Sequence, residues 1–147
     1  MSNENMKKYK VGYTQGVYDM FHIGHLNLIN HAKEYCDYLI VGINSDKLVE
    51  NYKKKHTVIN ETERATIVAN MKAVDEVIIV DTLNKEEILK NKRFDAVFIG
   101  DDWKGSDRWN ETERVMAQHG VDVVYLKHTD GISSTILRVV EENAIKE

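Results

Sequence analysis

The chain has 147 residues, of which 42% are hydrophobic and 30% charged, and its formal net charge is −4. This length fits one domain, 1–147, with one core, and the acidic balance argues against a general nucleic-acid binder, which is usually basic. No apolar run approaches the roughly 20 residues that span a bilayer, so we expect neither nucleic acid nor a membrane as a partner.

The N-terminal segment and the cysteine count predict a cytoplasmic protein. Residues 1–10 are polar and lack the apolar stretch of a secretory signal, and we expect residues 1–9 to be flexible. Cys36 is the sole cysteine, so it can form neither an internal disulfide nor a CxxC zinc site. We interpret Cys36 as a small buried hydrophobe.

Short β-rich runs alternate with amphipathic stretches along the chain. In chain order the pattern predicts strand 11–14, helix 24–35, strand 38–43, helix 61–72, strand 77–80, helix 85–91, strand 96–100, helix 112–119, strand 121–126 and helix 134–143. We expect a turn at Gln15-Gly16 and a polar, lysine-rich connection over residues 47–60. The continuous apolar run at 38–43 is typical of a strand covered on both faces.

Five buried strands that alternate with helices predict an α/β fold: a three-layer, doubly wound, parallel five-stranded sheet of the Rossmann-like kind. Such sheets bind ligands beyond the carboxyl ends of their strands, where the strand order reverses. We therefore expect the functional residues in the segments that directly follow the strands.

The first of these segments is Thr14-Gln15-Gly16-Val17-Tyr18-Asp19-Met20-Phe21-His22-Ile23-Gly24-His25. We expect Gly16 to permit a tight turn, so that loop N–H groups face a phosphate. The two histidines bracket a helix start, where the helix dipole favours an anion, and imidazoles there can donate hydrogen bonds to a phosphoryl group. Incidental capping or metal binding by HxxH are the alternatives, and we favour the phosphate.

Three further segments place polar side chains at strand or helix ends. Residues 100–105 (GDDWKG) follow a predicted strand, and acidic groups beside an aromatic ring can position a base or a sugar. Residues 128–135 (HTDGISST) bring hydroxyls to a helix start, where they either hold phosphate oxygens or cap the helix. Residues 53–64 (KKKHTVINETER) are either a phosphate-binding loop or a solvated one.

The first segment resembles the signature of the HxGH nucleotidyltransferase superfamily, and the others resemble cytidylyltransferases. Residues 100–105 resemble the GDDWxG segment of glycerol-3-phosphate cytidylyltransferases, residues 128–135 resemble RTEGISTT, and residues 53–64 resemble the family's lysine loop and ER-containing helix start. His128 stands where the family usually has arginine, and Lys72 also replaces an arginine. Because histidine is only partly charged near neutrality, the first replacement puts in doubt either nucleotide affinity at high pH or the usual role of that side chain.

The resemblance implies transfer of CMP from CTP to a small alcohol phosphate, with sn-glycerol 3-phosphate favoured, giving pyrophosphate and CDP-glycerol, a precursor of cell-surface polymers. It implies catalytic roles for His22, His25 and Lys54, and acceptor contacts from Lys53, Lys85 and Trp103. It implies nucleotide contacts from Thr14, Gly16, Val17, Tyr18, Gly24, Arg64, Asp101, Asp102, His128, Gly131, Ile132, Ser133, Ser134 and Thr135. It also implies Mg²⁺ bound with CTP, no metal held by the protein itself, and a homodimer.

Other functions stay open at this point. Residues 132–138 also resemble the ISSTxxR ending of adenylyltransferases of the same fold, so an FAD synthetase-like enzyme is one alternative. A nucleotide-sensing scaffold without turnover is another, although both histidines of HxGH are present. Phosphorylated choline or ethanolamine are alternative acceptors, and Arg108 and Trp109 could line an acceptor pocket or an interface.

Overall fold

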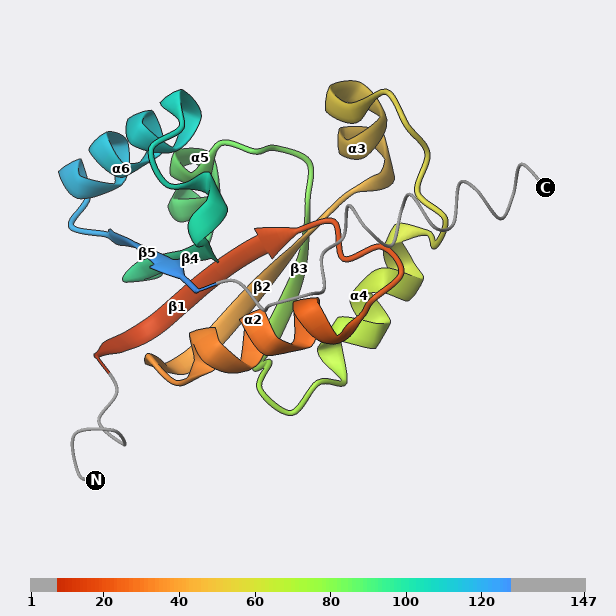
Figure 1. Cartoon of the computed structure of the whole chain (residues 1–147), viewed down its shortest axis with the longest axis horizontal. Coiled ribbons are helices and arrows are strands. Elements are labelled where there is room, and N and C mark those ends of the chain that lie inside the picture. The colour runs from red at the N-terminus through yellow and green to blue at the C-terminus, as the bar shows by residue number, and fades with distance from the viewer. Residues whose placement is uncertain (1–7, 128–147) are drawn as a thin grey trace.

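The computed structural model describes residues 8–127, which form one parallel five-stranded sheet with helices on both faces (Figure 1). In chain order the elements are β1 (Tyr9–Gly16), α2 (Ile23–Lys33), β2 (Cys36–Asn44), α3 (Asp46–Lys53), α4 (Glu61–Ala69), β3 (Glu76–Val80), α5 (Lys85–Asn91), β4 (Ala96–Gly100), the 3-10 helix η1 (Asp101–Trp103), α6 (Asp107–Gln118) and β5 (Asp122–Leu126). The predicted fold class is confirmed. The helix predicted at 134–143 lies outside the described residues.

The strands lie in the order β3-β2-β1-β4-β5, and every neighbouring pair is parallel. The chain therefore builds the sheet outward from β1 in one direction and then returns to the other side of β1 with β4. The strand order reverses between β1 and β4, which places the expected ligand-binding position at the carboxyl ends of these two strands.

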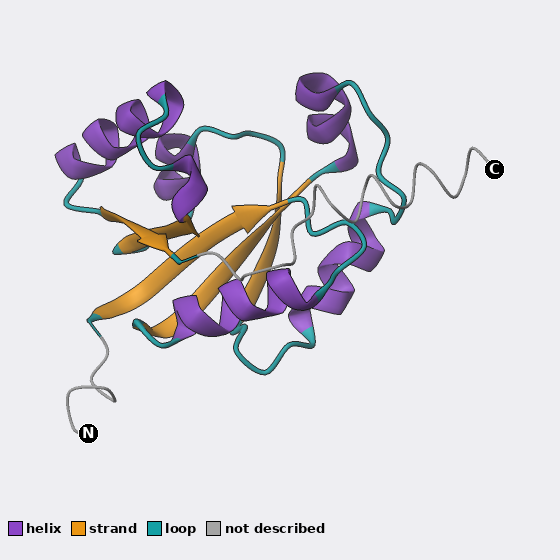
Figure 2. Cartoon of the chain, viewed as in Figure 1, coloured by secondary structure: helices purple, strands orange, loops and turns teal. Residues whose placement is uncertain are grey.

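Two hydrophobic cores lie on opposite faces of the sheet, and the helices cover them as Figure 2 shows. One core joins Ile29 of α2 and Val68 of α4 to Phe98 and other residues of the sheet. The second joins Trp109 of α6 and Ile88 of α5 to residues that include Tyr13. Burial of such large apolar side chains stabilises the fold by roughly 1.5–3 kcal/mol each.

The glycine of β2 shows how closely the second core packs against the sheet. A Cβ atom added to Gly42 would stand 2.0 Å from the hydroxyl oxygen of Tyr13. The ring of Tyr13 in turn stacks on that of Phe94, with their centroids 4.8 Å apart.

No helix within residues 8–127 is long and apolar enough to cross a bilayer.

Several predicted boundaries were wrong, each for a local reason. β1 begins at Tyr9, inside the segment expected to be flexible, and it includes the expected turn residues Gln15 and Gly16, because the ladder to β2 continues through them. Helix α6 begins at Asp107, five residues earlier than expected, because the Ser106 side chain caps it.

Helix α3 lies within the stretch that was expected to be a connection. The Ser45 hydroxyl accepts a hydrogen bond from the backbone N–H of Leu48 at 3.1 Å, and Leu48 and Val49 are buried. An N-cap followed by a short apolar pair is therefore the signal that the lysine-rich composition concealed.

Candidate active site

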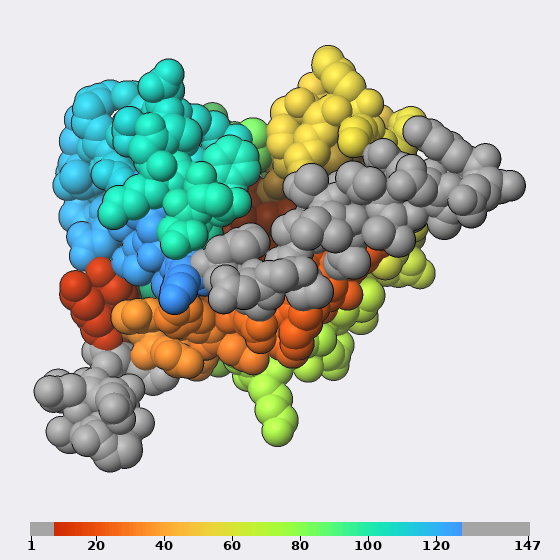
Figure 3. Space-filling view, in the orientation of Figure 1, coloured from red at the N-terminus to blue at the C-terminus, as the bar shows by residue number. Residues whose placement is uncertain are grey.

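The candidate site lies at the carboxyl edge of the sheet, where β1 and β4 end. The loop after β1 carries His22 and leads into α2, whereas η1 directly follows β4. Figure 3 shows a hollow between α3, in yellow, and the teal segment that includes η1, with the end of β1 in dark red at its floor. The strand-order reversal thus coincides with a concave surface flanked by two of the predicted motifs.

His22 and His25 form a stacked pair at the start of α2, with ring centroids 3.9 Å apart. The Nδ1 atom of His22 accepts a hydrogen bond from the Gly24 N–H at 3.0 Å, and Nδ1 of His25 accepts one from the His22 N–H at 3.3 Å. Because a neutral imidazole that accepts through Nδ1 carries its proton on Nε2, each ring presents its N–H on the side away from the helix backbone. The helix cap therefore fixes both rings as donors at a helix N-terminus, where an anion is favoured.

Aromatic side chains of the preceding loop hold the His25 ring in place. Tyr18 is 5% exposed and meets His25 edge to face at 5.2 Å, and Phe21 lies 5.3 Å from it. Tyr18 and Met20 adopt left-handed backbone conformations, with φ of 54° and 53°. The chain therefore turns at these two residues, which is costly for side chains other than glycine.

Gly16 does not form the tight turn that we expected. It ends β1, and a Cβ atom there would stand 3.1 Å from the Tyr18 ring. A glycine at this position lets the Tyr18 ring lie close against the strand end, which in turn places Tyr18 against His25.

Arg64 was expected to contact the nucleotide, but the structure buries its side chain completely and assigns it a positioning role. Its guanidinium donates to the carbonyl oxygens of Ile59 (2.8 Å), Val17 (2.7 Å) and Asn44 (2.9 Å). It also donates to the carboxylate of Asp46 at 2.6 Å. Four of the five N–H groups of the arginine are thus committed to the loop after β1, the end of β2 and the segment before α4.

The carboxylates that accompany Arg64 join the same segments. Burial opposes ionisation of Asp46, but hydrogen bonds from Arg64, from the Thr57 hydroxyl and from the Glu61 N–H outweigh it and lower the pKa of Asp46. Asp19, which is 4% exposed, accepts hydrogen bonds from the backbone N–H groups of Val58 (2.8 Å) and Ile59 (2.9 Å). We refer to Asp19, Asp46 and Arg64 as the loop clamp, because they fix the loop after β1 to residues 57–61.

The structure places the other predicted nucleotide residues as follows. Thr14 is fully buried and its hydroxyl donates to the carbonyl of Phe98 at 2.8 Å, so its side chain joins β1 to β4. The Val17 carbonyl accepts from Arg64, and Gly24 donates to His22. Asp101 and Asp102 are exposed on η1. His128, Gly131, Ile132, Ser133, Ser134 and Thr135 lie outside the described residues.

The predicted lysines lie in two separate places. Lys53 ends α3 and Lys54, with φ of 59°, caps it; both are exposed, and α3 forms one wall of the hollow in Figure 3. Lys85, by contrast, begins α5 and is only 6% exposed. Lys53 and Lys54 thus lie at the end of α3, whereas Lys85 lies at the start of α5 with its ammonium beside Trp109 of α6.

Lys85 is part of a cluster with Trp103, Arg108 and Trp109, which we call the cation–tryptophan cluster. The Lys85 ammonium lies 5.2 Å from the centroid of the Trp109 ring and donates to the Leu83 carbonyl at 3.0 Å. The Arg108 guanidinium lies 5.4 Å from the Trp103 ring and 5.9 Å from that of Trp109. Burial and, secondarily, the charge of Arg108 lower the pKa of Lys85 to about 8.

Polar groups also join the strand ends beneath the hollow. The Gln15 side-chain amide donates to the Asn44 side-chain oxygen (2.7 Å) and to the Thr82 carbonyl (3.1 Å), and Asn44 donates to the Tyr52 hydroxyl (3.1 Å). Sequence reasoning missed Gln15 and Asn44, although each is the polar residue at or near the end of an apolar strand. No three histidine, cysteine or acidic side chains within residues 8–127 come together as a metal site.

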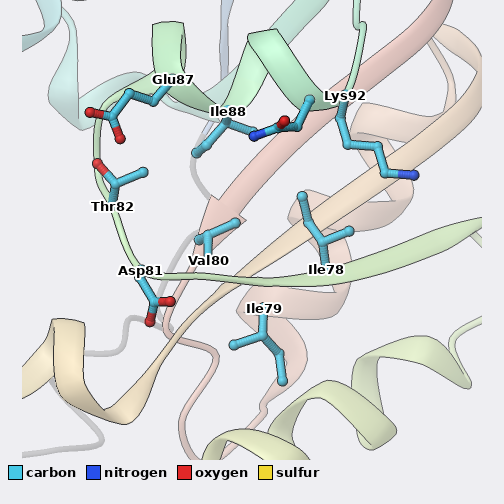
Figure 4. Close-up of a pocket in the computed structure, with 9 residues that line it drawn as sticks. Ile78, Ile79, Val80, Asp81, Thr82, Glu87, Ile88 and Lys92 are labelled. Carbon is cyan, nitrogen blue, oxygen red and sulfur yellow. The ribbon is translucent and has the colours of Figure 1, made fainter.

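A separate groove of about 320 Å³ lies at the edge strand β3 and contains none of the predicted site residues. Figure 4 shows Ile78, Val80 and Ile88 lining it, with Asp81 and Lys92 at its margins. Lys92, which directly follows α5, forms an ion pair with Glu76 of β3. The groove is thus mainly an apolar gap between β3 and α5.

Comparison with known proteins gives a consistent result. The sequence model of the family described as cytidylyltransferase-like matches residues 13–140. A protein named glycerol-3-phosphate cytidylyltransferase from Bacillus spizizenii is 34% identical, over 85% of this chain and 92% of that protein. The bifunctional protein HldE of Caulobacter sp. strain K31 is 37% identical, over 87% of this chain but only 26% of that protein. The chain thus spans about a quarter of the length of the HldE relatives.

Solved structures support the fold. A lipopolysaccharide core biosynthesis protein from Thermoplasma volcanium superposes with a TM-score of 0.69 at 21% identity, over 82% of this chain and 97% of that one. Pantothenate synthetase from Thermus thermophilus gives a TM-score of 0.65 at 15% identity, over 96% of this chain and 66% of that one.

We expect the pKa of His22 to lie below 6.5, because burial lowers it. We also expect the neutral ring to carry its proton on Nε2, because a proton on Nδ1 would face the Gly24 N–H. The folded state therefore disfavours the charged ring, so stability is full above pH 6.5 and declines as the pH falls below it. Long-range ¹H–¹⁵N spectra recorded across pH measure the pKa of His22 and show which ring nitrogen carries the proton. The urea-unfolded chain gives the reference pKa. A folded-state midpoint at or above the unfolded one would contradict the assignment.

Replacing Arg64→Lys should lower the free energy of unfolding by about 2–4 kcal/mol, since a lysine cannot reproduce the fork that reaches three carbonyls and a carboxylate. Urea unfolding measures the change. The matched control is Arg114→Lys, whose exposed pair with Glu111 should change stability by no more than about 0.5 kcal/mol. Equal effects of the two replacements would exclude the loop clamp as a main source of stability.

Proposed function

This chain belongs to the cytidylyltransferase-like family of nucleotidyltransferase enzymes, and we propose that it transfers CMP from CTP to a small phosphorylated alcohol, with release of pyrophosphate. The observation that carries the proposal is the stacked His22–His25 pair, whose Nδ1 atoms are both committed to the helix cap. Two N–H donors at a helix start suit an anion that gains charge during reaction.

The proposed reaction is a direct in-line displacement. An anionic oxygen of the acceptor's phosphate attacks the α-phosphorus of CTP, a new oxygen–phosphorus bond forms, and the bond to the β-phosphate breaks as pyrophosphate leaves with the electron pair. Because the attacking oxygen is already anionic, no general base is needed. Catalysis then rests on positioning and on stabilising the charge on the transferred phosphoryl group and on pyrophosphate, which are the roles we propose for His22 and His25.

We propose that CTP enters as its magnesium complex, with the metal carried on the phosphates as part of the substrate. Lys54, at the end of α3, is proposed to hold the triphosphate together with residues 131–135. A homodimer, implied by the family resemblance, and a cytoplasmic location, expected from the polar N-terminal segment and the single cysteine, complete the proposal.

The first candidate for the acceptor is sn-glycerol 3-phosphate, giving CDP-glycerol. Its support is the similarity to the Bacillus spizizenii protein named glycerol-3-phosphate cytidylyltransferase, 92% of which is matched by this chain. Lys85, at the start of α5, and Trp103, at the end of η1, are two of the proposed acceptor residues. Lys53, at the end of α3, is the third proposed acceptor residue.

The first test is pyrophosphate release by purified protein with Mg²⁺, with CTP or ATP and with sn-glycerol 3-phosphate, phosphocholine, phosphoethanolamine or FMN. We expect turnover with CTP and glycerol 3-phosphate, and we expect His25→Ala to lower kcat by about 10²–10³-fold, since one charge-stabilising donor is lost. His31→Ala, on the same helix, is the matched control and should retain activity. Turnover with ATP alone would replace the proposal by an adenylyltransferase.

The acceptor KM should rise above pH 8, by as much as about tenfold per pH unit, whereas the KM for CTP should not follow it. The pKa of Lys85 is lowered to about 8, so its ammonium is charged below pH 8 and loses its charge above it. The neighbouring Arg108 stays charged throughout, and the phosphate remains a dianion from pH 7 upward. In Lys85→Met the acceptor KM should be high and independent of pH between 7 and 9.5; a wild-type profile that is flat over this range would contradict the role of Lys85.

A further inference from the structure

We propose that Arg108 is a specificity residue, which restricts the acceptor to phosphorylated alcohols whose remaining part is uncharged, such as a polyol phosphate, and rejects phosphate esters of amino alcohols. This inference rests on the proposed function and names the residue that sets the class of acceptor. It is carried by the contacts of the cation–tryptophan cluster.

The chain between η1 and α6 brings Arg108 against both tryptophans. Gly105, with φ of 88°, turns the backbone after η1, and the Ser106 N–H donates to the Trp103 carbonyl at 3.2 Å. Arg108 follows in the first turn of α6, and its guanidinium lies between 5.4 and 5.9 Å from the two ring centroids. It thus joins a ring that is 45% exposed to one that is 2% exposed.

The cluster has two positive charges, and neither forms an ion pair with a carboxylate of the described residues. Within residues 8–127, no carboxylate forms an ion pair with Lys85 or Arg108. Asp102 turns back toward the strand end, where its Oδ1 atom would stand 2.9 Å from a Cβ atom on Gly100. Two cations that form no ion pair within residues 8–127, at the carboxyl edge of a parallel sheet, match the charge of a phosphate dianion.

The rings of the cluster already bind the protein's own cations. An exposed tryptophan is otherwise a favourable site for a quaternary or primary ammonium group, through attraction to its ring face. Here the guanidinium of Arg108 lies over Trp103, and Arg108 and the Lys85 ammonium both lie by Trp109. The ammonium group of a cationic acceptor would therefore be repelled by Arg108 and Lys85 instead of being attracted to a tryptophan ring. Such repulsion is one way in which a binding site rejects a competing ligand.

The buried part of the cluster argues against the alternative that this segment is an interface. Trp109 is 2% exposed and belongs to the core beneath α5 and α6. Its Nε1 donor has no hydrogen-bond partner in the described part of the chain. Of the two tryptophans only Trp103 is substantially exposed, and the other side chains that residues 101–108 expose are charged. Charged residues are depleted at the centre of protein interfaces.

The test compares kcat/KM for sn-glycerol 3-phosphate, phosphocholine and phosphoethanolamine at saturating CTP. We expect wild-type protein to prefer glycerol 3-phosphate by at least about 100-fold, and Arg108→Met to reduce that preference by about tenfold or more, with the KM for CTP unchanged. Arg108→Lys retains the charge and should keep most of the preference, which separates loss of charge from loss of folding. Arg114→Met, an exposed arginine further along α6, is the matched control.

Binding is measured independently by the change in tryptophan fluorescence on titration with each of the three acceptors. The acceptor affinities should follow the same order as kcat/KM in the wild type and in Arg108→Met. An unchanged preference in Arg108→Met, or a wild type that favours phosphocholine, would overturn the role of Arg108 while leaving CMP transfer in place. Absence of CTP-dependent pyrophosphate release with every acceptor would overturn the proposed function and this inference together.

Discussion

The buried guanidinium of Arg64 is the interaction on which the arrangement of the site depends. It connects the carbonyls of Val17, Asn44 and Ile59, which come from three segments that are far apart in the sequence. A single planar group with five donors can satisfy such a set of acceptors, whereas water would leave the loops free to move apart. Asp19 completes the connection from the opposite direction, because its carboxylate accepts from the segment that Arg64 also reaches. The loop that carries His22 is therefore fixed by the protein's own polar groups.

The histidine pair shows how a helix cap can serve chemistry. An ordinary N-cap satisfies the first N–H groups of a helix with a serine or aspartate, and here imidazoles take that place through Nδ1. The same hydrogen bonds that begin α2 also select which ring nitrogen carries the proton. Because α2 starts where the strand order reverses, the two donors, the helix dipole and the hollow coincide without any dedicated metal ligand in the described part of the chain.

The sequence predicted those parts of the fold that leave a pattern in hydrophobicity. The continuous apolar run of β2 and the alternation of strands with helices gave the fold class, and the HxGH spacing identified the pair at the start of α2. The structural roles of Arg64 and Thr14 could not be predicted, because nothing in a charged or hydroxyl residue type indicates that it will be buried. The turn was expected at Gly16 because glycine adopts positive φ without steric cost, whereas Tyr18 and Met20 adopt it here. Lysines likewise concealed α3, whose buried face has only two buried apolar residues.

The two cores divide the site between opposite faces of the sheet. Tyr18 and α2, which support the histidines, pack into one core, whereas Trp109 of the cation–tryptophan cluster packs into the other. Substitutions in the core beneath α5 and α6 thus act on different packing from that which supports the imidazoles. Natural selection could then exchange one alcohol for another while the transfer chemistry is inherited intact. Such a division would let a small domain diversify into many biosynthetic roles, and be recruited into longer polypeptides, without reinventing its reaction.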